Sequence, residues 1–198
     1  MFNDDEDTTL ITVPGWGDSG PGHWQSLWER GYPLSRRVVQ DDWLYPERTL
    51  WVARLAETVA DTPGRIVLAA HSLGCHTVVA WAAGLSLRAA ARIRGALLVA
   101  PPALPIAEAA VRAAGELPEG APLPAFAGFE TAATTPLPFA ATLVASRNDP
   151  FCPWAEAEGL ARLWRAELED AGEAGHISTA WGYGSWPAGQ RLVQRYIL

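Results

Sequence analysis

Short apolar runs alternate along the chain with longer segments whose apolar residues recur every three or four positions. The runs are rich in branched side chains and end at glycine, proline or polar residues, which is typical of buried strands. They occupy residues 9–13, 65–68, 95–100 and 140–146, with weaker candidates at 37–39 and 165–168. The helical periodicity predicts helices over residues 23–30, 48–60, 155–164 and 187–197, and around 77–81. Residues 115–138 show little periodicity, and we expect a loop with one short helix there.

Strands that are spaced by helices of this length indicate βαβ crossovers. The sequence therefore predicts an α/β fold with a mostly parallel sheet of about six strands and helices on both faces. No internal repeat or linker divides the chain, so residues 1–198 are expected to form a single domain. In such sheets, ligands bind beyond the carboxyl ends of the strands. The loops that follow residues 13, 71 and 146 all lie at that edge.

Composition and charge narrow the possible functions. The net charge is −7 and no basic cluster is present, which argues against binding to nucleic acid. No apolar stretch approaches the roughly 18 residues of a membrane-spanning helix. Residues 1–8 are acidic where a secretory signal would be basic, so we expect a flexible N-terminus and a cytoplasmic protein.

Cysteine and lysine content excludes further classes. The two cysteines, Cys75 and Cys152, show no metal-ligand spacing and are read as small buried residues, and neither a metal nor a cofactor is expected. All 15 basic residues are arginines, which excludes Schiff-base, Ser–Lys and Walker-lysine chemistry. The expected partner is a small molecule, without membrane or nucleic acid.

Ser72 stands in the segment AHSLG, residues 70–74, directly between a predicted buried strand and a predicted buried helix. A sharp strand-to-helix turn exposes a serine hydroxyl and directs helix N–H groups toward a carbonyl under attack. The usual pattern of such a nucleophile elbow is G-x-S-x-G, and Ala70 is a small departure from it. An ordinary helix N-cap is the alternative for a serine in this position.

The order of the remaining candidates favours catalysis. In α/β-hydrolases an acid and then a histidine follow the serine along the chain. His176 is the only histidine after Ser72 that does not lie on the same helix, and it precedes the final predicted helix. Asp149 and Asp170 are the only aspartates after Ser72. Asp149 is favoured because it follows a buried strand, whereas Asp170 lies in a stretch that looks solvated.

Two backbone N–H groups are expected to form an oxyanion hole. Leu73 follows the nucleophile directly, and Trp16 follows Gly15 in the loop after the first strand. Three tryptophans, Trp16, Trp181 and Trp186, lie in loops that converge on the predicted site and could line an apolar substrate pocket. His71 is expected to support the elbow by packing or hydrogen bonding, and His23 to pack at a helix start.

Four segments carry a resemblance to a known family. TVPGWGDSGPGHWQ, AHSLGCHTVVAWA, VASRNDPFCP and EAGHISTAWGYGSWPAG resemble the hallmark segments of the small α/β-hydrolases related to retinoblastoma-binding protein 9 and the bacterial YdeN proteins. The likeness extends from about residue 10 to residue 198. It implies an α/β-hydrolase fold. A chain of 198 residues leaves little room for a large cap domain in addition to that fold. The likeness also implies a Ser72–Asp149–His176 triad and serine esterase activity on small carboxylic esters through an acyl-enzyme.

Two other functions use the same sequence features differently. A protein-interaction module could use the hydrolase fold as a scaffold, although residues 73–77 lack the final glutamate of the Leu-x-Cys-x-Glu pattern for retinoblastoma binding. An acyltransferase would use the same triad with an alcohol or amine in place of water.

Overall fold

The computed structural model describes residues 7–198 and places six parallel strands in one sheet, in the order β2-β1-β3-β4-β5-β6. The strands are β1 (Thr8–Val13), β2 (Ser35–Arg37), β3 (Arg65–His71), β4 (Ile93–Val99), β5 (Ala141–Ala145) and β6 (Glu167–Asp170). The helices are α1 (Trp24–Gly31), α2 (Arg48–Ala60), α3 (Leu73–Ala82), α4 (Leu87–Ala90), α5 (Glu108–Ala113), α6 (Trp154–Trp164) and α7 (Pro187–Ile197), with a 3-10 helix, η1, at Thr179–Trp181.

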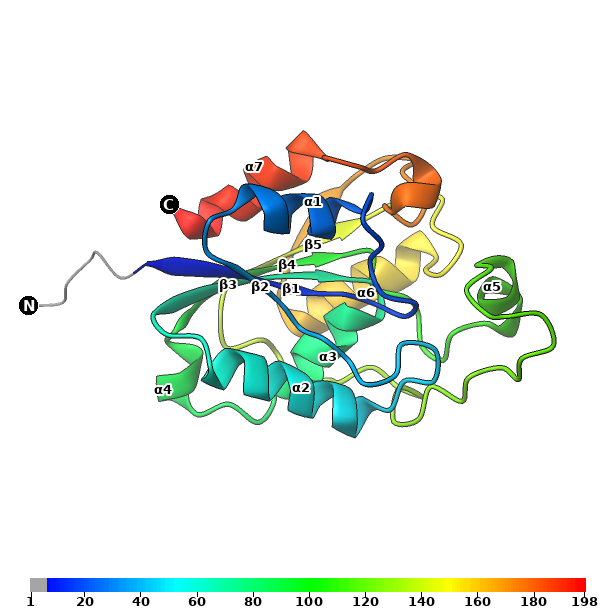
Figure 1. Cartoon of the computed structure of the whole chain (residues 1–198), viewed down its shortest axis with the longest axis horizontal. Helices are drawn as coiled ribbons and strands as arrows, with labels where there is room; N and C mark the ends of the chain where they lie inside the picture. The colour runs from blue at the N-terminus through cyan, green and yellow to red at the C-terminus, as the bar shows by residue number, and fades with distance from the viewer. Residues whose placement is uncertain (1–6) are drawn as a thin grey trace, which may run out of the picture.

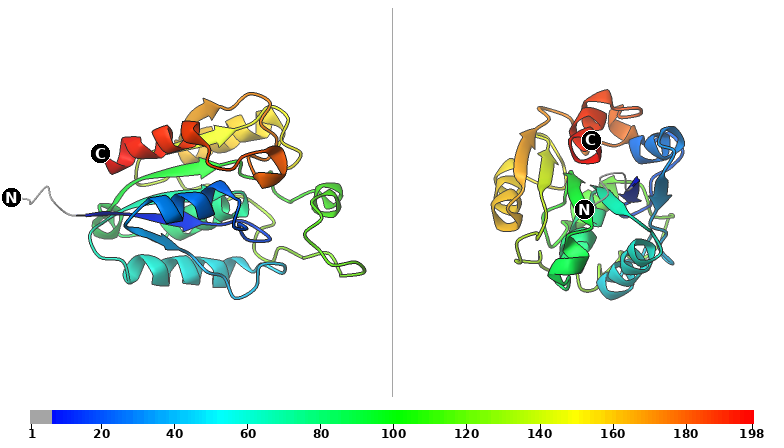
Figure 2. Two further views of the ribbon diagram at one scale, coloured as in Figure 1. Left: turned by 45° about the horizontal axis from the view of Figure 1, so that its top comes forward. Right: turned by 90° about the vertical axis from the view of Figure 1, so that its left-hand side faces the viewer.

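Helices cover both faces of the sheet (Figures 1 and 2). Alternate residues of β3 pack on opposite faces of the sheet. Leu68 and Ala70 pack in the core shared with α2, α3 and α6, whereas Val67 and Ala69 pack with α1 and α7. Because both faces of the strand are covered, its sequence is a continuous apolar run rather than an alternating one. The predicted fold class, a parallel sheet between two helical layers, is confirmed.

The four strong apolar runs and the five periodic segments all coincide with elements of the predicted type. The two weak strands were placed wrongly by about two residues. The edge strand ends at Arg37, although Val38 still donates its N–H to the Thr12 carbonyl. The last strand begins only at Glu167, because Arg165 ends α6 in a left-handed conformation with φ 55°.

Two further expectations need correction. The short helix expected within residues 115–138 lies earlier, at α5, and the described residues 115–138 contain none. Of the segment expected to be a flexible N-terminus, residues 1–6 lie outside the described residues, and Thr8 is the first residue of β1. The pairing of Thr8 with Arg65 of β3 explains why the strand starts so early.

The carboxyl ends of β1, β3 and β5 meet at one edge of the sheet. At the same edge, the chain between β4 and β5 extends past the strand ends and carries α5 (Figure 1). The candidate catalytic residues all lie in loops at this edge, as the parallel sheet predicts.

Candidate active site

Ser72 occupies a strained turn between β3 and α3. Its backbone has φ 52° and ψ −127°, a conformation that non-glycine residues adopt rarely and that is concentrated at functional sites. The turn is crowded. A Cβ atom on Gly15 would lie 2.6 Å from the Ser72 Cβ, and one on Gly74 would collide with the Val13 carbonyl oxygen. Glycine is therefore required at position 74 of the elbow and at position 15 of the facing loop, whereas Ala70 lies fully buried within β3 and is accommodated there.

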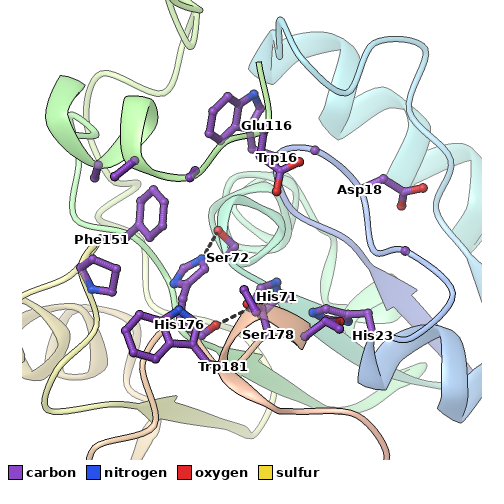
Figure 3. Close-up of a pocket in the computed structure, with 18 of the residues that line it drawn as sticks. Trp16, Asp18, His23, His71, Ser72, Glu116, Phe151, His176, Ser178 and Trp181 are labelled. Atoms are coloured by element: carbon purple, nitrogen blue, oxygen red, sulfur yellow. Dashed lines mark hydrogen bonds between the residues drawn. The ribbon is translucent and has the colours of Figure 1, made fainter. Parts of the chain in front are cut away.

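Three side chains form a hydrogen-bonded chain that starts at this serine, and Figure 3 shows its first link, from Ser72 to His176. Ser72 Oγ lies 2.8 Å from His176 Nε2, and His176 Nδ1 lies 2.9 and 3.0 Å from the two carboxylate oxygens of Asp149. A carboxylate at Nδ1 accepts a hydrogen bond from the Nδ1–H group, so Nε2 of the neutral ring carries no proton and can accept the one from serine. This arrangement can activate the hydroxyl as a nucleophile.

Asp149 lies in the loop after β5 and is held by its surroundings. Its side chain is only 2% exposed, and its Oδ1 also accepts the N–H of Phe151 at 2.9 Å. Asp170, the alternative carboxylate, lies at the end of β6 and forms an ion pair with Arg147 at 2.7 Å. Hydrogen bonding to Arg147 lowers the pKa of the Asp170 carboxyl. The structure thus brings Asp149, and not Asp170, to His176.

Two polar residues that sequence reasoning missed join the Asp149 loop to the His176 loop. Asn148 Oδ1 accepts from the Gly175 N–H at 2.7 Å and from the Ser146 hydroxyl at 2.8 Å. The Ser146 oxygen in turn accepts the Ala174 N–H at 2.9 Å. The signal was available in the sequence, since three polar residues and an aspartate follow the apolar strand directly.

His71 holds the backbone of the candidate base. Its Nε2 lies 2.9 Å from the His176 carbonyl oxygen, which can only accept, so Nε2 carries the proton. Burial holds the pKa of His71 well below its ordinary value. The adjacent His23 caps α1 by accepting the Gln25 N–H, and burial, together with the nearby Arg37 charge, lowers its pKa to about 3. Both rings are therefore neutral near pH 7.

The two expected oxyanion donors, Trp16 and Leu73, each follow one residue of the close contact between Gly15 and Ser72. Within the described residues, neither the Trp16 N–H nor the Leu73 N–H donates a hydrogen bond to the protein. The Trp16 side chain is fixed away from the serine, with Nε1 donating to the Leu44 carbonyl at 2.9 Å. Both donors are free for a ligand oxygen.

A cavity of about 630 Å³ opens over Ser72 and His176. Apolar residues of α5 and its flanking loop form one wall, and Trp16, Phe151 and Trp181 complete it. Trp181 is 47% exposed at the rim.

The expectation for Trp186 was wrong. Its ring is 8% exposed and stacks on Trp28 at 5.7 Å in the core beneath α1 and α7. It does not line the cavity, because its position at the start of α7 directs the ring toward α1.

Residues 7–198 contain no group of three or more His, Cys, Asp or Glu side chains that could hold a metal ion. Cys75 and Cys152 are buried free thiols, and burial raises the pKa of both. Over the same range, no helix is both long and apolar enough to cross a membrane.

The sheet, the elbow at the end of β3 and the helices on both faces define an α/β-hydrolase. The chain belongs to the serine hydrolase family, whose profile matches residues 10–195. Its relatives by structure include YdeN-like hydrolases, in agreement with the resemblance of the four sequence segments.

Three solved structures illustrate the similarity. A putative YdeN-like hydrolase from Pectobacterium atrosepticum is 30% identical, with a TM-score of 0.77 over 96% of this chain and 91% of that one. The ydeN gene product of B. subtilis is 18% identical, with a TM-score of 0.72 over 96% and 98% of the two chains. The type II thioesterase BorB from the borrelidin biosynthetic cluster is 14% identical, with a TM-score of 0.66 over 97% and 93%. No curated protein matches the sequence significantly.

Proposed function

We propose that this serine hydrolase cleaves small carboxylic esters through an acyl-enzyme on Ser72. The observation that carries the proposal is the hydrogen-bonded chain from Ser72 Oγ through His176 to Asp149, at 2.8 and 2.9 Å. Its members come from three separate loops, and the helix-capping alternative for Ser72 is not supported, since its side chain caps no helix N–H. A scaffold that only binds a partner has no need for this geometry.

In the proposed reaction, His176 Nε2 takes the Ser72 proton while Oγ forms a bond to the ester carbonyl carbon. The carbonyl oxygen becomes an oxyanion between the Trp16 and Leu73 N–H groups. The intermediate collapses, the bond to the alcohol oxygen breaks, and His176 returns its proton to the leaving alkoxide. A water molecule then attacks the acyl-enzyme by the same route, which releases the carboxylic acid and restores Ser72.

The test is covalent labelling with a fluorophosphonate combined with hydrolysis of a p-nitrophenyl ester. Ser72→Ala should abolish both, while circular dichroism shows an intact fold. Ser178→Ala is the matched control, because Ser178 lines the same cavity and should leave labelling and hydrolysis within a few-fold of the parent. Labelling of Ser72→Ala at the parental rate would refute the proposal.

A product analysis separates hydrolysis from acyl transfer. With an added alcohol or amine, a hydrolase gives mainly the free carboxylic acid. A transferase would give mainly the new ester or amide at low acceptor concentration.

A further inference from the structure

The charges around the cavity are unbalanced. Its described lining includes two carboxylates, Asp18 and Glu116, and no arginine. Asp18 is paired with Arg37 at 2.9 Å. Glu116 forms no ion pair or hydrogen bond with any described residue, and its side chain is exposed at the mouth of the cavity. An unpaired carboxylate beside the candidate nucleophile is available to a ligand.

The loop after β1 approaches both Ser72 and Glu116. Gly15 contacts the Ser72 Cβ, and Gly17, two residues further on, contacts Glu116: a Cβ atom added to Gly17 would lie 2.5 Å from Glu116 Oε2. Residues 15–18 form a turn in which the Asp18 N–H donates to the Gly15 carbonyl at 3.2 Å, so the glycine that contacts Glu116 lies within one short turn of the glycine that contacts Ser72. Figure 3 shows Glu116 beside Trp16, across the cavity from Trp181.

Neutral histidines do not offset this charge. His23 and His71 line the same cavity, and burial lowers the pKa of both, that of His23 to about 3. The remaining lining is uncharged: it combines apolar residues such as Ile106, Ala110 and Phe151 with the neutral hydroxyl groups of Ser178 and Thr179. The field near Glu116 is therefore negative, and the low-dielectric wall strengthens it.

We propose that Glu116 selects esters that carry a cationic amine on the part facing its carboxylate in the cavity and disfavours esters that carry an anionic group there. The inference rests on the proposed esterase function and narrows its substrate class. Its chemical reason is direct: an ammonium group is attracted to the unpaired carboxylate, whereas a carboxylate or phosphate on the substrate is repelled. Phosphate-bearing thioesters are accordingly poor substrates.

The test compares matched esters. On the acyl side, p-nitrophenyl 6-aminohexanoate is cationic, the heptanoate is its neutral isostere and the monoadipate is anionic. On the alcohol side, butyrylcholine is compared with 3,3-dimethylbutyl butyrate. In one of these two series, acyl or alcohol, the charged group faces Glu116. In that series, kcat/KM should be about tenfold higher for the cationic ester than for the neutral one, and this ratio should fall with added salt.

Variants assign the preference to the residue. In Glu116→Gln, the ratio of kcat/KM for the cationic ester to that for the neutral ester should fall to about twofold or less. In Glu116→Arg, the preference should reverse, so that the adipate has a higher kcat/KM than the cationic ester. Glu119→Gln is the control, since it removes the same charge from the same exposed loop without touching the cavity lining, and its ratio should match the parent.

The outcomes distinguish a failure of the proposed role of Glu116 from a failure of the proposed esterase function. Equal kcat/KM for charged and neutral esters on both sides, or a preference that survives in Glu116→Gln, overturns the role of Glu116 but leaves the esterase intact. Absence of hydrolysis for every ester refutes the proposed function itself.

Discussion

At the scale of single residues, the proposed mechanism depends on which carboxylate supports His176. Asp149 contacts His176 Nδ1 with both oxygens, whereas Asp170 contacts Arg147. Asp149→Asn should lower kcat by several orders of magnitude, because an amide cannot stabilise the imidazolium; the serine protease precedent is about 10⁴. Steady-state kinetics on an activated ester measures the effect.

Asp170→Asn is the matched change at an exposed position. It should stay within a few-fold of the parent, as surface substitutions usually do. If Asp170→Asn, and not Asp149→Asn, is the variant that loses several orders of magnitude in kcat, the assignment of Asp149 as the catalytic acid is wrong.

The hydrogen bonds around Asn148 predict a second effect. Asn148→Ala removes the acceptor for the Gly175 N–H and the Ser146 hydroxyl, so the loops of Asp149 and His176 lose part of their connection. We expect kcat to fall by about 10- to 100-fold, because a small displacement of a catalytic group strongly lowers the rate of the chemical step. KM should change little. Arg147→Ala, next along the same loop but exposed, should change kcat less than threefold. Equal losses in the two variants would show only a general loosening of the loop.

At the scale of elements, two helical glycines should respond in opposite ways to alanine. Alanine ordinarily stabilises a helix interior by about 1 kcal/mol over glycine. At Gly159 in α6 no atom lies within 4 Å of an added Cβ, so Gly159→Ala should raise Tm. At Gly74 in α3 the Cβ meets the carbonyl oxygens of Val13 and Pro14, so Gly74→Ala should lower Tm and reduce activity. Thermal denaturation of both variants and the parent measures these changes in Tm. A higher Tm for Gly74→Ala than for the parent would contradict the close approach of α3 to the loop after β1.

The elements also show what the sequence could and could not predict. Strands buried on both faces, such as β3, are visible as apolar runs, and the order serine, acid, histidine identified three residues that the fold brings together. The direction of a side chain on a distant loop is not visible in this way. Trp186 turned into the core against Trp28, and His71 contacted the His176 carbonyl, 105 residues away. Such contacts depend on long-range packing, which local patterns do not encode.

At the scale of the whole molecule, buried neutral histidines link stability to pH. His23 has a pKa of about 3 in the folded protein, below the ordinary 6.5, so the unfolded chain binds more protons between these values. The stabilisation is complete above about pH 6.5 and is lost as the pH falls toward 3. From pH 7 to 5, where most carboxyl groups remain ionised, His23 alone should account for a loss of about 2 kcal/mol.

His23→Asn tests the linkage because asparagine is also a good N-cap but does not titrate. The urea-derived free energy of unfolding should fall less steeply between pH 7 and 5 in this variant than in the parent. Parallel curves would mean that His23 has the same pKa in the folded and unfolded states, which would contradict the linkage.

The most direct test of the central claim is the identity of the acylated residue. The enzyme is mixed with excess p-nitrophenyl butyrate, quenched with acid within milliseconds to seconds, digested and analysed by mass spectrometry. The proposed mechanism predicts a burst of p-nitrophenol and a butyryl group on Ser72, and both should be lost in His176→Ala, because Ser72 then lacks the base that takes its proton. A butyryl group on Ser178, Cys75 or any other residue, with Ser72 unmodified, would contradict the account.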